Sequence, residues 1–404
     1  MQLVVINDHA HINGGAAKVA IDSAKGFARR GHRVTYFAAV GPIEPGLIEA
    51  GVEVVLLDQP DVRSAASLMR FGAQWLWNGA AEAKLSALLA DSNPTDTIVH
   101  VHGWAKALSP SIGRALRRAG LPVVHTLHEY YLACPNGGFY DHGAARNCGR
   151  TAMSMGCVLH NCDSRGYHRK LMRVGRHALM RHGSGLVETA RHVIVISRLQ
   201  REAIAPYLPH ATFHEVGNPI DVRDQGVRSE GPGDFIFVGR LSAEKGARYF
   251  AQAARRAGVA PVYIGDGPER DALQHEFPEA RFLGWLQPDG VRAHLRAARA
   301  LVFPSVWYEG QPLTVYESLA LGAPVIVSDI CAGREAVAHG ENGFWFRSAD
   351  VESLSEKIMW LKDDALARRM SDAAHGKYWA NPLTLDRHLD AVAAVHDLVR
   401  KDYR

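Results

Sequence analysis

Residues 300–322 read ALVFPSVWYEGQPLTVYESLALG. The apolar run at 300–303 predicts a buried strand, and a helix is expected to begin near Pro312, because proline is favoured in the first turn of a helix. A loop that leads from a parallel strand into a helix N-terminus is a common place for an anionic ligand. Two carboxylates, Glu309 and Glu317, lie on this loop and in the second turn of the helix. The stretch therefore predicts an α/β fold with a ligand site at this loop.

The same alternation of strand and helix extends over most of the chain. Short apolar runs separated by helical patterns predict parallel, doubly wound sheets. In the first half, strands are predicted at 3–6, 34–37, 52–56, 98–101, 123–127 and 193–196, with helices at 16–30 and 109–118. In the second half, strands are predicted at 235–238, 262–264, 281–283, 300–303 and 324–327. The fold class is α/β, with two Rossmann-like domains that are expected to face each other across a cleft.

A turn and a polar, glycine-rich segment interrupt the pattern, so the domain junction is placed at 218–233. Residues 1–217 then form an N-terminal domain, 218–378 a second domain, and 379–404 a C-terminal helix that is expected to pack back on the first domain. Two domains also fit a length of 404 residues. Loops that follow strands should line the cleft, and these are 8–15, 100–104, 125–130, 239–246, 265–269 and 305–312.

The bulk composition excludes several classes of protein. With 47% apolar and 22% charged residues and a net charge of +4, the chain is globular and too weakly basic to predict a nucleic-acid partner. No apolar run approaches the ~20 residues that span a bilayer. The first residues, MQLVVIN, lack the basic start and long apolar stretch of a signal peptide. A cytoplasmic location is expected.

Basic and glycine-rich loops follow two of the predicted strands. Arg240 and Lys245 lie five residues apart on one of them, and arginine presents a fork to phosphate oxygens while lysine presents a compact charge. Alone, this could equally be a solvated basic loop; together with 309–317 it favours phosphate binding. Gly14 and Gly15 could let backbone N–H groups approach a diphosphate, or form a plain turn. Because the G-x-G-x-x-G spacing is absent there, a nicotinamide-dependent oxidoreductase is the weakest interpretation.

Three histidines, His102, His125 and His128, lie at the carboxyl ends of predicted strands in the first domain. A histidine in this position can enter a cleft, although many are only structural. We favour His128 as the functional one.

Together these pieces resemble retaining glycosyltransferases of family 4, which have the GT-B fold, and the resemblance runs over most of the chain. The C-terminal set is specific as a combination, whereas no single piece would be. The matching segments are Glu309-x7-Glu317, Gly239-Arg240-Leu241 with Lys245-Gly246, Gly265-Asp266-Gly267-Pro268-Glu269, Phe303-Pro304-Ser305, Gly322-Ala323-Pro324-Val325, Asn218-Pro219-Ile220-Asp221 and Thr126-Leu127-His128-Glu129.

The resemblance implies roles for individual residues. Arg240 and Lys245 would hold the diphosphate of a nucleotide-sugar donor, and Glu317 would bind the ribose hydroxyls. Glu309 would touch the transferred sugar, and His128 would contact that sugar beside the reacting carbon. The implied catalytic set is His128, Glu309, Arg240 and Lys245. The implied donor-binding set is Gly14, Gly15, Arg240, Lys245, Gly265, Asp266, Glu309, Gly310, Glu317 and the backbone N–H groups of Leu313 and Thr314, so the second domain binds the donor and the first faces the acceptor.

The chemistry that this arrangement suits is the departure of a diphosphate. Breaking the anomeric C–O bond leaves growing negative charge on the nucleoside diphosphate, which two cations and a helix N-terminus would stabilise. Carboxylate-bound Mg²⁺ could do the same, but the chain contains no Asp-x-Asp triplet. The sequence therefore favours a reaction without a metal cofactor. The resemblance also implies that the anomeric configuration of the transferred sugar is retained. It does not show that Glu309 is a nucleophile.

Four of the five cysteines, Cys134, Cys148, Cys157 and Cys162, fall in a segment that we interpret as an insertion at about 134–162. Four thiolates would suit a tetrahedral structural zinc. The spacing does not form two tight knuckles, so free or partly buried cysteines and a redox pair remain alternatives. Cys331 stands apart and is expected in the core.

The segment 165–182 contains six basic residues and no acid, with apolar residues at helical spacing. Such a helix could lie on an anionic membrane surface, hold a phosphate-bearing acceptor, or be a surface helix with a charged outer face. The basic residues are Arg165, Arg169, Lys170, Arg173, Arg176 and Arg181, and the apolar ones are Tyr167, Leu171, Val174 and Ala178.

The sequence thus predicts a metal-independent, retaining hexosyltransferase that uses a nucleotide-sugar donor and a saccharide or lipid-linked saccharide acceptor in cell-surface or exopolysaccharide synthesis. It would work in the cytoplasm, with a location at the inner face of the membrane as a further expectation. The alternatives are a nucleotide-sugar epimerase on the same fold and a non-catalytic nucleotide-sugar-binding protein.

Overall fold

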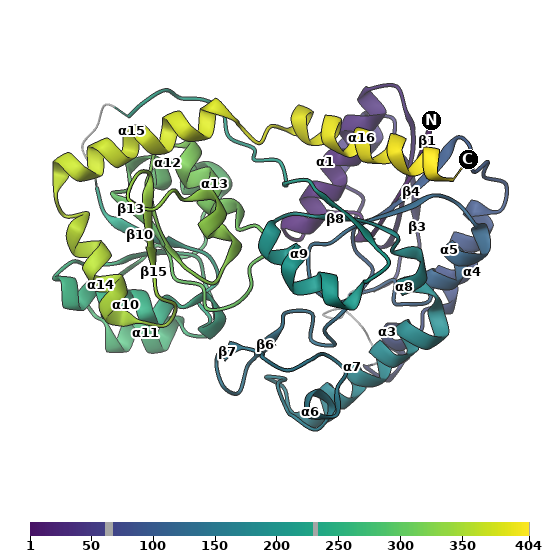
Figure 1. Ribbon diagram of the computed structural model, residues 1–404, viewed down its shortest axis with the longest axis horizontal. Coiled ribbons are helices and arrows are strands. Elements are labelled where there is room, and N and C mark those ends of the chain that lie inside the picture. The colour runs from purple at the N-terminus through teal and green to yellow at the C-terminus, as the bar shows by residue number, and fades with distance from the viewer. Residues whose placement is uncertain (61–67, 229–232, 404) are drawn as a thin grey trace. The chain divides into compact units, whose positions relative to one another are not determined.

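The computed structural model describes residues 1–60, 68–228 and 233–403, and the chain divides into two compact units (Figure 1). The first unit consists of Met1–Gly138, Arg150–Pro219 and Thr384–Arg404, and the second of Phe139–Gly149 and Ile220–Leu383. The chain passes from one to the other after Pro219, within the predicted junction at 218–233, of which 229–232 lie outside the described residues. Each unit is built around one parallel sheet.

The sheet of the first unit has seven parallel strands in the order β3-β2-β1-β4-β5-β8-β9. Central strands are apolar runs because helices cover both faces of the sheet. The order reverses between β1 and β4, which makes their carboxyl ends the topological switch point of the unit. The strands are β1 Gln2–His9, β2 Arg33–Val40, β3 Glu53–Leu56, β4 Thr97–Val101, β5 Val123–Thr126, β8 His192–Val195 and β9 Thr212–Glu215.

Helices cover this sheet, and on one face α1 (Gly15–Arg29) lies beside α16 (Leu385–Asp402) (Figure 1). The two helices approach closely at Gly26, where a Cβ would lie 2.4 Å from Cδ1 of Leu389. The last helix therefore belongs to the first unit. The other helices of this unit are α2 Pro45–Glu49, α3 Leu68–Leu76, α4 Gly79–Leu89, α5 Ile112–Ala119, α6 Met155–Val158, α7 Tyr167–Leu179, α8 Leu186–Thr189 and α9 Arg198–Ile204.

The sheet of the second unit has six parallel strands in the order β12-β11-β10-β13-β14-β15, with the switch point between β10 and β13. The strands are β10 Phe235–Val238, β11 Val262–Ile264, β12 Arg281–Phe282, β13 Ala300–Phe303, β14 Val325–Ser328 and β15 Gly343–Phe346. The helices are α10 Ala247–Ala257, α11 Arg270–Glu276, α12 Pro288–Ala297, α13 Leu313–Ala320, α14 Val351–Trp360 and α15 Asp364–Ala380.

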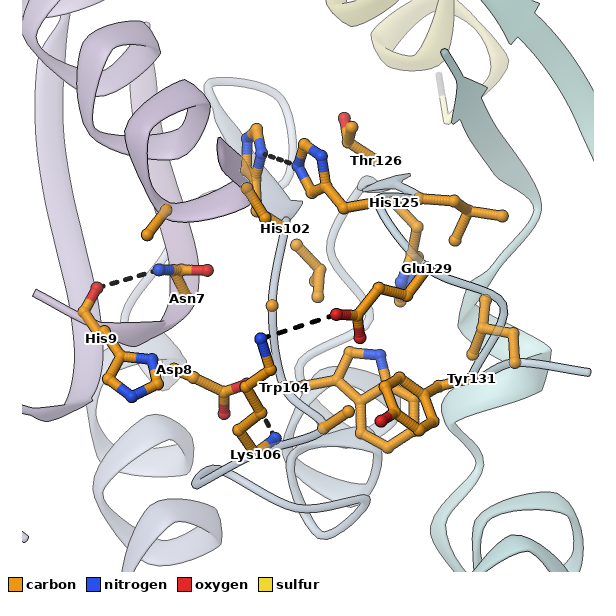
Figure 2. Close-up of a pocket in the computed structure, with 18 of the residues that line it drawn as sticks. Asn7, Asp8, His9, His102, Trp104, Lys106, His125, Thr126, Glu129 and Tyr131 are labelled. Carbon is orange, nitrogen blue, oxygen red and sulfur yellow. Dashed lines mark hydrogen bonds and ion pairs between the residues drawn. The ribbon is translucent and has the colours of Figure 1, made fainter. Parts of the chain in front are cut away.

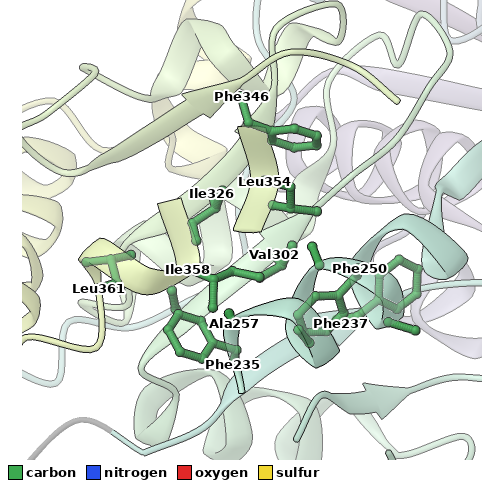
Figure 3. Close-up of a cluster of buried hydrophobic side chains, with 14 of the residues drawn as sticks. Phe235, Phe237, Phe250, Ala257, Val302, Ile326, Phe346, Leu354, Ile358 and Leu361 are labelled. Carbon is green, nitrogen blue, oxygen red and sulfur yellow. The ribbon is translucent and has the colours of Figure 1, made fainter. Parts of the chain in front are cut away.

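One face of this second sheet packs on α10 and α14 through a cluster of buried aromatic and aliphatic side chains (Figure 3). Phe250 from α10 and Ile358 from α14 are fully buried against Phe237 and Val302 from the sheet. Burying a side chain of this size contributes about 1.5–3 kcal/mol. The cluster thus fixes the two helices on the strands that carry the loops of interest.

The predicted fold class is confirmed as two doubly wound, parallel α/β sheets, while the expected cleft between them stays a prediction. The predicted insertion at 134–162 differs in one respect: Phe139–Gly149, with the antiparallel strands β6 (Tyr140–Asp141) and β7 (Arg146–Asn147), groups with the second unit. The second unit also runs to Leu383 rather than 378, because α15 continues to Ala380. In the described part of the chain, no helix is long and apolar enough to cross a bilayer.

Candidate functional site

In the second unit, the loops after β10 and β13 meet at the switch point. Lys245 ends a short 3-10 helix after β10, and its ammonium pairs with Oε1 of Glu309, which lies on the loop after β13. The hydroxyl of Ser305 donates to the same carboxylate oxygen at 3.0 Å. The N–H of Val306 donates to the carbonyl of Glu244 at 2.9 Å and joins the two loops. The structure thus brings Lys245 and Glu309, two predicted site residues, into direct contact.

Two glycines allow this close approach of loops. Gly246 has a φ of 73°, and a Cβ there would lie 2.1 Å from the carbonyl oxygen of Pro304. Gly265 has a φ of 131°, and a Cβ there would lie 2.0 Å from the carbonyl oxygen of Gly239. Only glycine fits both the backbone conformation and the space. The loops after β10, β11 and β13 are therefore held together by their main chains.

Helix α13 begins directly after this loop, at Leu313, with Pro312 before it. Its first turn contains no acidic residue, and the residue before it makes no side-chain capping hydrogen bond. The positive end of the helix is therefore not neutralised by a local carboxylate in the first turn. The N–H groups of Leu313 and Thr314 belong to this turn, and Glu317, half-buried, follows in the next.

The other predicted residues of this unit surround the same loops. The Arg240 side chain is exposed and forms no hydrogen bond or ion pair with the described residues. Gly310 follows Glu309 directly. Asp266, beside Gly265, accepts the N–H of Gly267 at 2.7 Å and pairs with Arg270 at 3.2 Å, so its carboxylate already organises its own loop.

Cys331 is fully buried close to this site, as expected of a core cysteine. Burial, reinforced by the charge of Glu309, raises the pKa of its thiol to about 12. The thiol is therefore protonated at neutral pH and is not a nucleophile.

The first unit has a pocket at the carboxyl ends of β1, β4 and β5, which is the switch point of its sheet (Figure 2). Asp8 is buried at its base and accepts the backbone N–H groups of Lys106, Ala107 and Leu108, each at 2.8 Å. This carboxylate fixes the loop after β4. The loop at 8–15 was predicted to line the cleft, but this role of Asp8 was not predicted, because an acid directly after a strand is only a weak signal.

Lys106 and Glu129 reach toward each other across this pocket (Figure 2), with Nζ 3.5 Å from Oε1. Burial raises the pKa of Glu129, and the lysine opposes this effect. Trp104 and Tyr131 form an aromatic wall beside them, with ring centroids 6.5 Å apart. Lys106 and Tyr131 were not predicted, because nothing in the local pattern distinguishes them from other loop residues.

His128 lines the same pocket, and its Nε2 shares a 3.2 Å hydrogen bond with Nδ1 of His102. Burial, with smaller contributions from His388 and Lys106, lowers the pKa of His128 to about 3. His128 is therefore a neutral imidazole at physiological pH. His125 takes another partner, the hydroxyl of Thr189 at 3.1 Å, although it also lines the pocket.

Gly14 and Gly15 lie at the start of α1, where Gly14 precedes the first helical residue without a side-chain cap. Their neighbours Asn13 and Ala16 line the pocket. The structure thus places both glycines at its rim.

The four cysteines of the insertion do not form a metal cluster. Cys157 and Cys162 both contact the buried ammonium of Lys170, at 3.4 and 3.3 Å, and Cys148 lies in the segment that groups with the second unit. Within residues 1–60, 68–228 and 233–403, no group of three or more His, Cys, Asp or Glu is placed to hold a metal ion. An ammonium between two sulfurs does not fit a four-thiolate zinc site.

Helix α7 covers most of the predicted basic segment, and its buried side chains are not the apolar ones at helical spacing. Lys170, Arg176 and His177 are buried, whereas Tyr167 and Leu171 are exposed. The basic residues can be buried because sulfur atoms and a backbone carbonyl accept their hydrogen bonds and an aromatic ring packs against a guanidinium.

Two family models match the chain. One, described as Glycosyltransferase Family 4, matches residues 13–224, and one described as Glycosyl transferases group 1 matches residues 232–364. Among solved structures, HepE of Anabaena in complex with UDP and glucose has a TM-score of 0.64 and 16% identity, and the match covers 98% of this chain and 99% of that one.

Curated proteins match over shorter stretches. A UDP-Gal:alpha-D-GlcNAc-diphosphoundecaprenol alpha-1,3-galactosyltransferase of Escherichia coli is 28% identical over 172 residues, which are 39% of this chain and 43% of that protein. A glycogen synthase of Mycobacterium tuberculosis is 27% identical over 310 residues, 73% of this chain and 67% of that protein. The match thus spans less than half the length of the Escherichia coli relative.

Proposed function

Because the chain belongs to glycosyltransferase family 4 and has the GT-B fold, we propose that it is a retaining transferase that moves a hexose-type sugar from a nucleotide sugar to a saccharide or lipid-linked saccharide. Its pathway would be the synthesis of a cell-surface polysaccharide or exopolysaccharide. The similar proteins support this choice, since one is named for transfer to a diphosphoundecaprenol-linked sugar and one is a structure with UDP and glucose.

The observation that carries the donor site is the grouping of Arg240, Lys245 and the start of α13 at one switch point. A diphosphate between them would receive two positive side chains and the N–H groups of the first helical turn. These groups would stabilise the charge that grows as the sugar departs. Glu317 on α13 is proposed for the ribose, and Glu309 for the transferred sugar. No metal cofactor is proposed for this step.

The pocket of the first unit is proposed as the acceptor side of the reaction. His128 would contact the donor sugar as a neutral imidazole, which can donate or accept a hydrogen bond without adding charge. The aromatic wall of Trp104 and Tyr131 offers apolar faces of the kind that pack against sugar rings. A location at the inner face of a membrane is part of the same proposal.

Lys245→Ala tests the proposal most simply. We expect kcat for sugar transfer to fall roughly 10²–10³-fold, the loss that is typical when one donor to a developing anion is removed. The matched control is Lys377→Ala, which removes an exposed lysine of the same unit that pairs with Glu341. Transfer at the wild-type rate by Lys245→Ala, with both variants folded, would rule the donor site out.

The reaction products distinguish the transferase from an epimerase and from a binding protein. An epimerase would convert the nucleotide sugar with no acceptor present, and a binding protein would bind it without turnover. Nucleotide-sugar consumption followed with and without added saccharide acceptor distinguishes all three. We expect release of the nucleoside diphosphate to accelerate on adding acceptor, with no epimer formed.

A further inference from the structure

Arg176 is a buried arginine on α7 that lies beside the pocket of Figure 2. Its side chain is only 5% exposed, and its guanidinium carbon lies 4.4 Å from the ring centroid of Trp75 and 5.3 Å from that of Trp104. Nε donates to the carbonyl oxygen of Trp75 at 2.8 Å. Burial lowers the pKa of Arg176 to about 10, with Asp8 opposing this effect, so the group still carries its charge at pH 7. The two rings thus enclose a permanent cation.

The N–H donors of this guanidinium are not all paired. Nη2 of Arg176 is buried without a hydrogen-bond partner, and in the described part of the chain no carboxylate lies within ion-pair distance of the guanidinium. Arg173, on the preceding turn, does have such a partner in Asp163 at 2.9 Å. Leaving a buried donor unpaired is unfavourable, and more so when the group is charged. A purely structural arginine would be expected to have this donor occupied.

The neighbouring residue His177 shares the same feature. It is 3% exposed, and its Nε2 also lacks a partner. Arg176 and His177 line one small recess, together with Arg173, Trp104 and Tyr131. The two aromatic residues also line the pocket of Figure 2, so the recess and the pocket share a wall. Two unpaired nitrogen atoms therefore lie beside the proposed acceptor pocket.

We propose that Arg176 and His177 bind an oxyanion, a phosphate or a carboxylate, that the acceptor carries. A guanidinium offers planar N–H groups that match the oxygens of either anion. A neutral His177 can add an N–H donor at Nε2. In this proposal the anion occupies the recess, and the rest of the acceptor lies in the neighbouring pocket. The inference rests on the proposed function only where it names the anion as part of an acceptor.

The test is a titration of the full chain that does not require catalysis. In the Lys245→Ala background, which weakens anion binding at the donor site, inorganic pyrophosphate and glucuronate are added separately. Tryptophan fluorescence reports binding because Trp75 and Trp104 contact the guanidinium. We expect a saturable change with at least one probe. Saturation by pyrophosphate alone assigns a phosphate-bearing acceptor, and saturation by glucuronate alone assigns an acidic sugar.

Substitutions show which residues bind the probe that changes the fluorescence. Arg176→Gln should weaken binding of the responding probe at least tenfold, and His177→Asn should weaken it several-fold. Arg169→Gln, which removes an exposed arginine from the same helix, should leave binding unchanged. If Arg176→Gln does not fold, His177→Asn decides.

Two results would overturn the inference: no saturable change with either probe, or unchanged affinity in a folded Arg176→Gln or His177→Asn variant. Neither result bears on the donor site, whose failure would instead appear as normal turnover by Lys245→Ala.

Discussion

At the scale of single residues, the contact between Lys245 and Glu309 gives the proposed donor site a testable property. Without donor, the lysine charge is partly neutralised by the carboxylate, which is only 12% exposed. A diphosphate must therefore compete with Glu309 for the ammonium. The same carboxylate is proposed to touch the transferred sugar, so it should oppose binding of the diphosphate alone while assisting transfer.

Glu309→Gln separates these two effects. We expect the variant to bind a nucleoside diphosphate several-fold more tightly, because the ammonium is no longer paired, and to transfer sugar more slowly. Calorimetric titration and initial rates measure the two quantities. Glu341→Gln is the control, since it also releases a lysine, Lys377, but away from the switch point. Weaker diphosphate binding by Glu309→Gln would contradict the competition.

The sequence predicted candidate site residues in the second unit but not how they contact each other. Glu309 and Lys245 were recognisable because they follow predicted strands, and parallel strands bring their carboxyl ends to one edge. The contact of Arg176 with Trp75 could not be predicted, since 101 residues separate them and only tertiary packing joins them. Asp8 and Lys106, 98 residues apart, were missed for the same reason.

At the scale of elements, α6 and α7 combine exposed apolar residues with exposed basic ones. Met155 is 72% and Leu159 67% exposed, and Leu171 is 44% exposed. Arg165 and Arg169 are exposed on the same segment. Apolar side chains that insert among lipids next to arginines that attract anionic headgroups would hold this segment on a membrane surface.

Flotation with vesicles measures this association. We expect the protein to float with vesicles that contain phosphatidylglycerol and much less with neutral phosphatidylcholine. A Leu159→Asp and Leu171→Asp double variant should lose most of the association. Leu398→Asp, at an exposed leucine on α16, is the control. The proposal fails if the control loses as much binding as the double variant, or if the wild-type protein does not float.

Element boundaries were predicted well where a strand is a short apolar run. The predicted strands at 235–238, 262–264 and 300–303 coincide with β10, β11 and β13. β9 was missed because three of its four residues are polar and the strand is partly exposed at the edge of the sheet. The buried face of α7 could not be predicted from periodicity, which assumes that charged residues face water, whereas here Lys170 and Arg176 have buried partners.

At the scale of the whole molecule, the two units differ in their buried histidines. Burial lowers the pKa of His125 to about 4 and of His128, His177 and His396 to about 3, all in the first unit. In the described part of the second unit, His339 is the histidine with a lowered pKa. The first unit therefore contains more imidazoles that remain neutral in the folded state.

Acid should destabilise the first unit before the second. As pH falls below about 6.5, these histidines gain protons in the unfolded chain but not in the folded one, so the free energy of unfolding decreases until the folded pKa is reached. Each deeply shifted histidine would remove on the order of 2 kcal/mol at pH 5. Hydrogen exchange at pH 7.5 and 5 resolves the two units. Earlier loss of protection in the second unit would contradict this expectation.

The central claim is that the diphosphate of a sugar donor binds between Arg240, Lys245 and the first turn of α13. A crystal structure with the nucleoside diphosphate that most raises the melting temperature tests it directly. We expect diphosphate oxygens within hydrogen-bond distance of both side chains and of the N–H groups of Leu313 and Thr314. A bound diphosphate that leaves these groups without contact would contradict it.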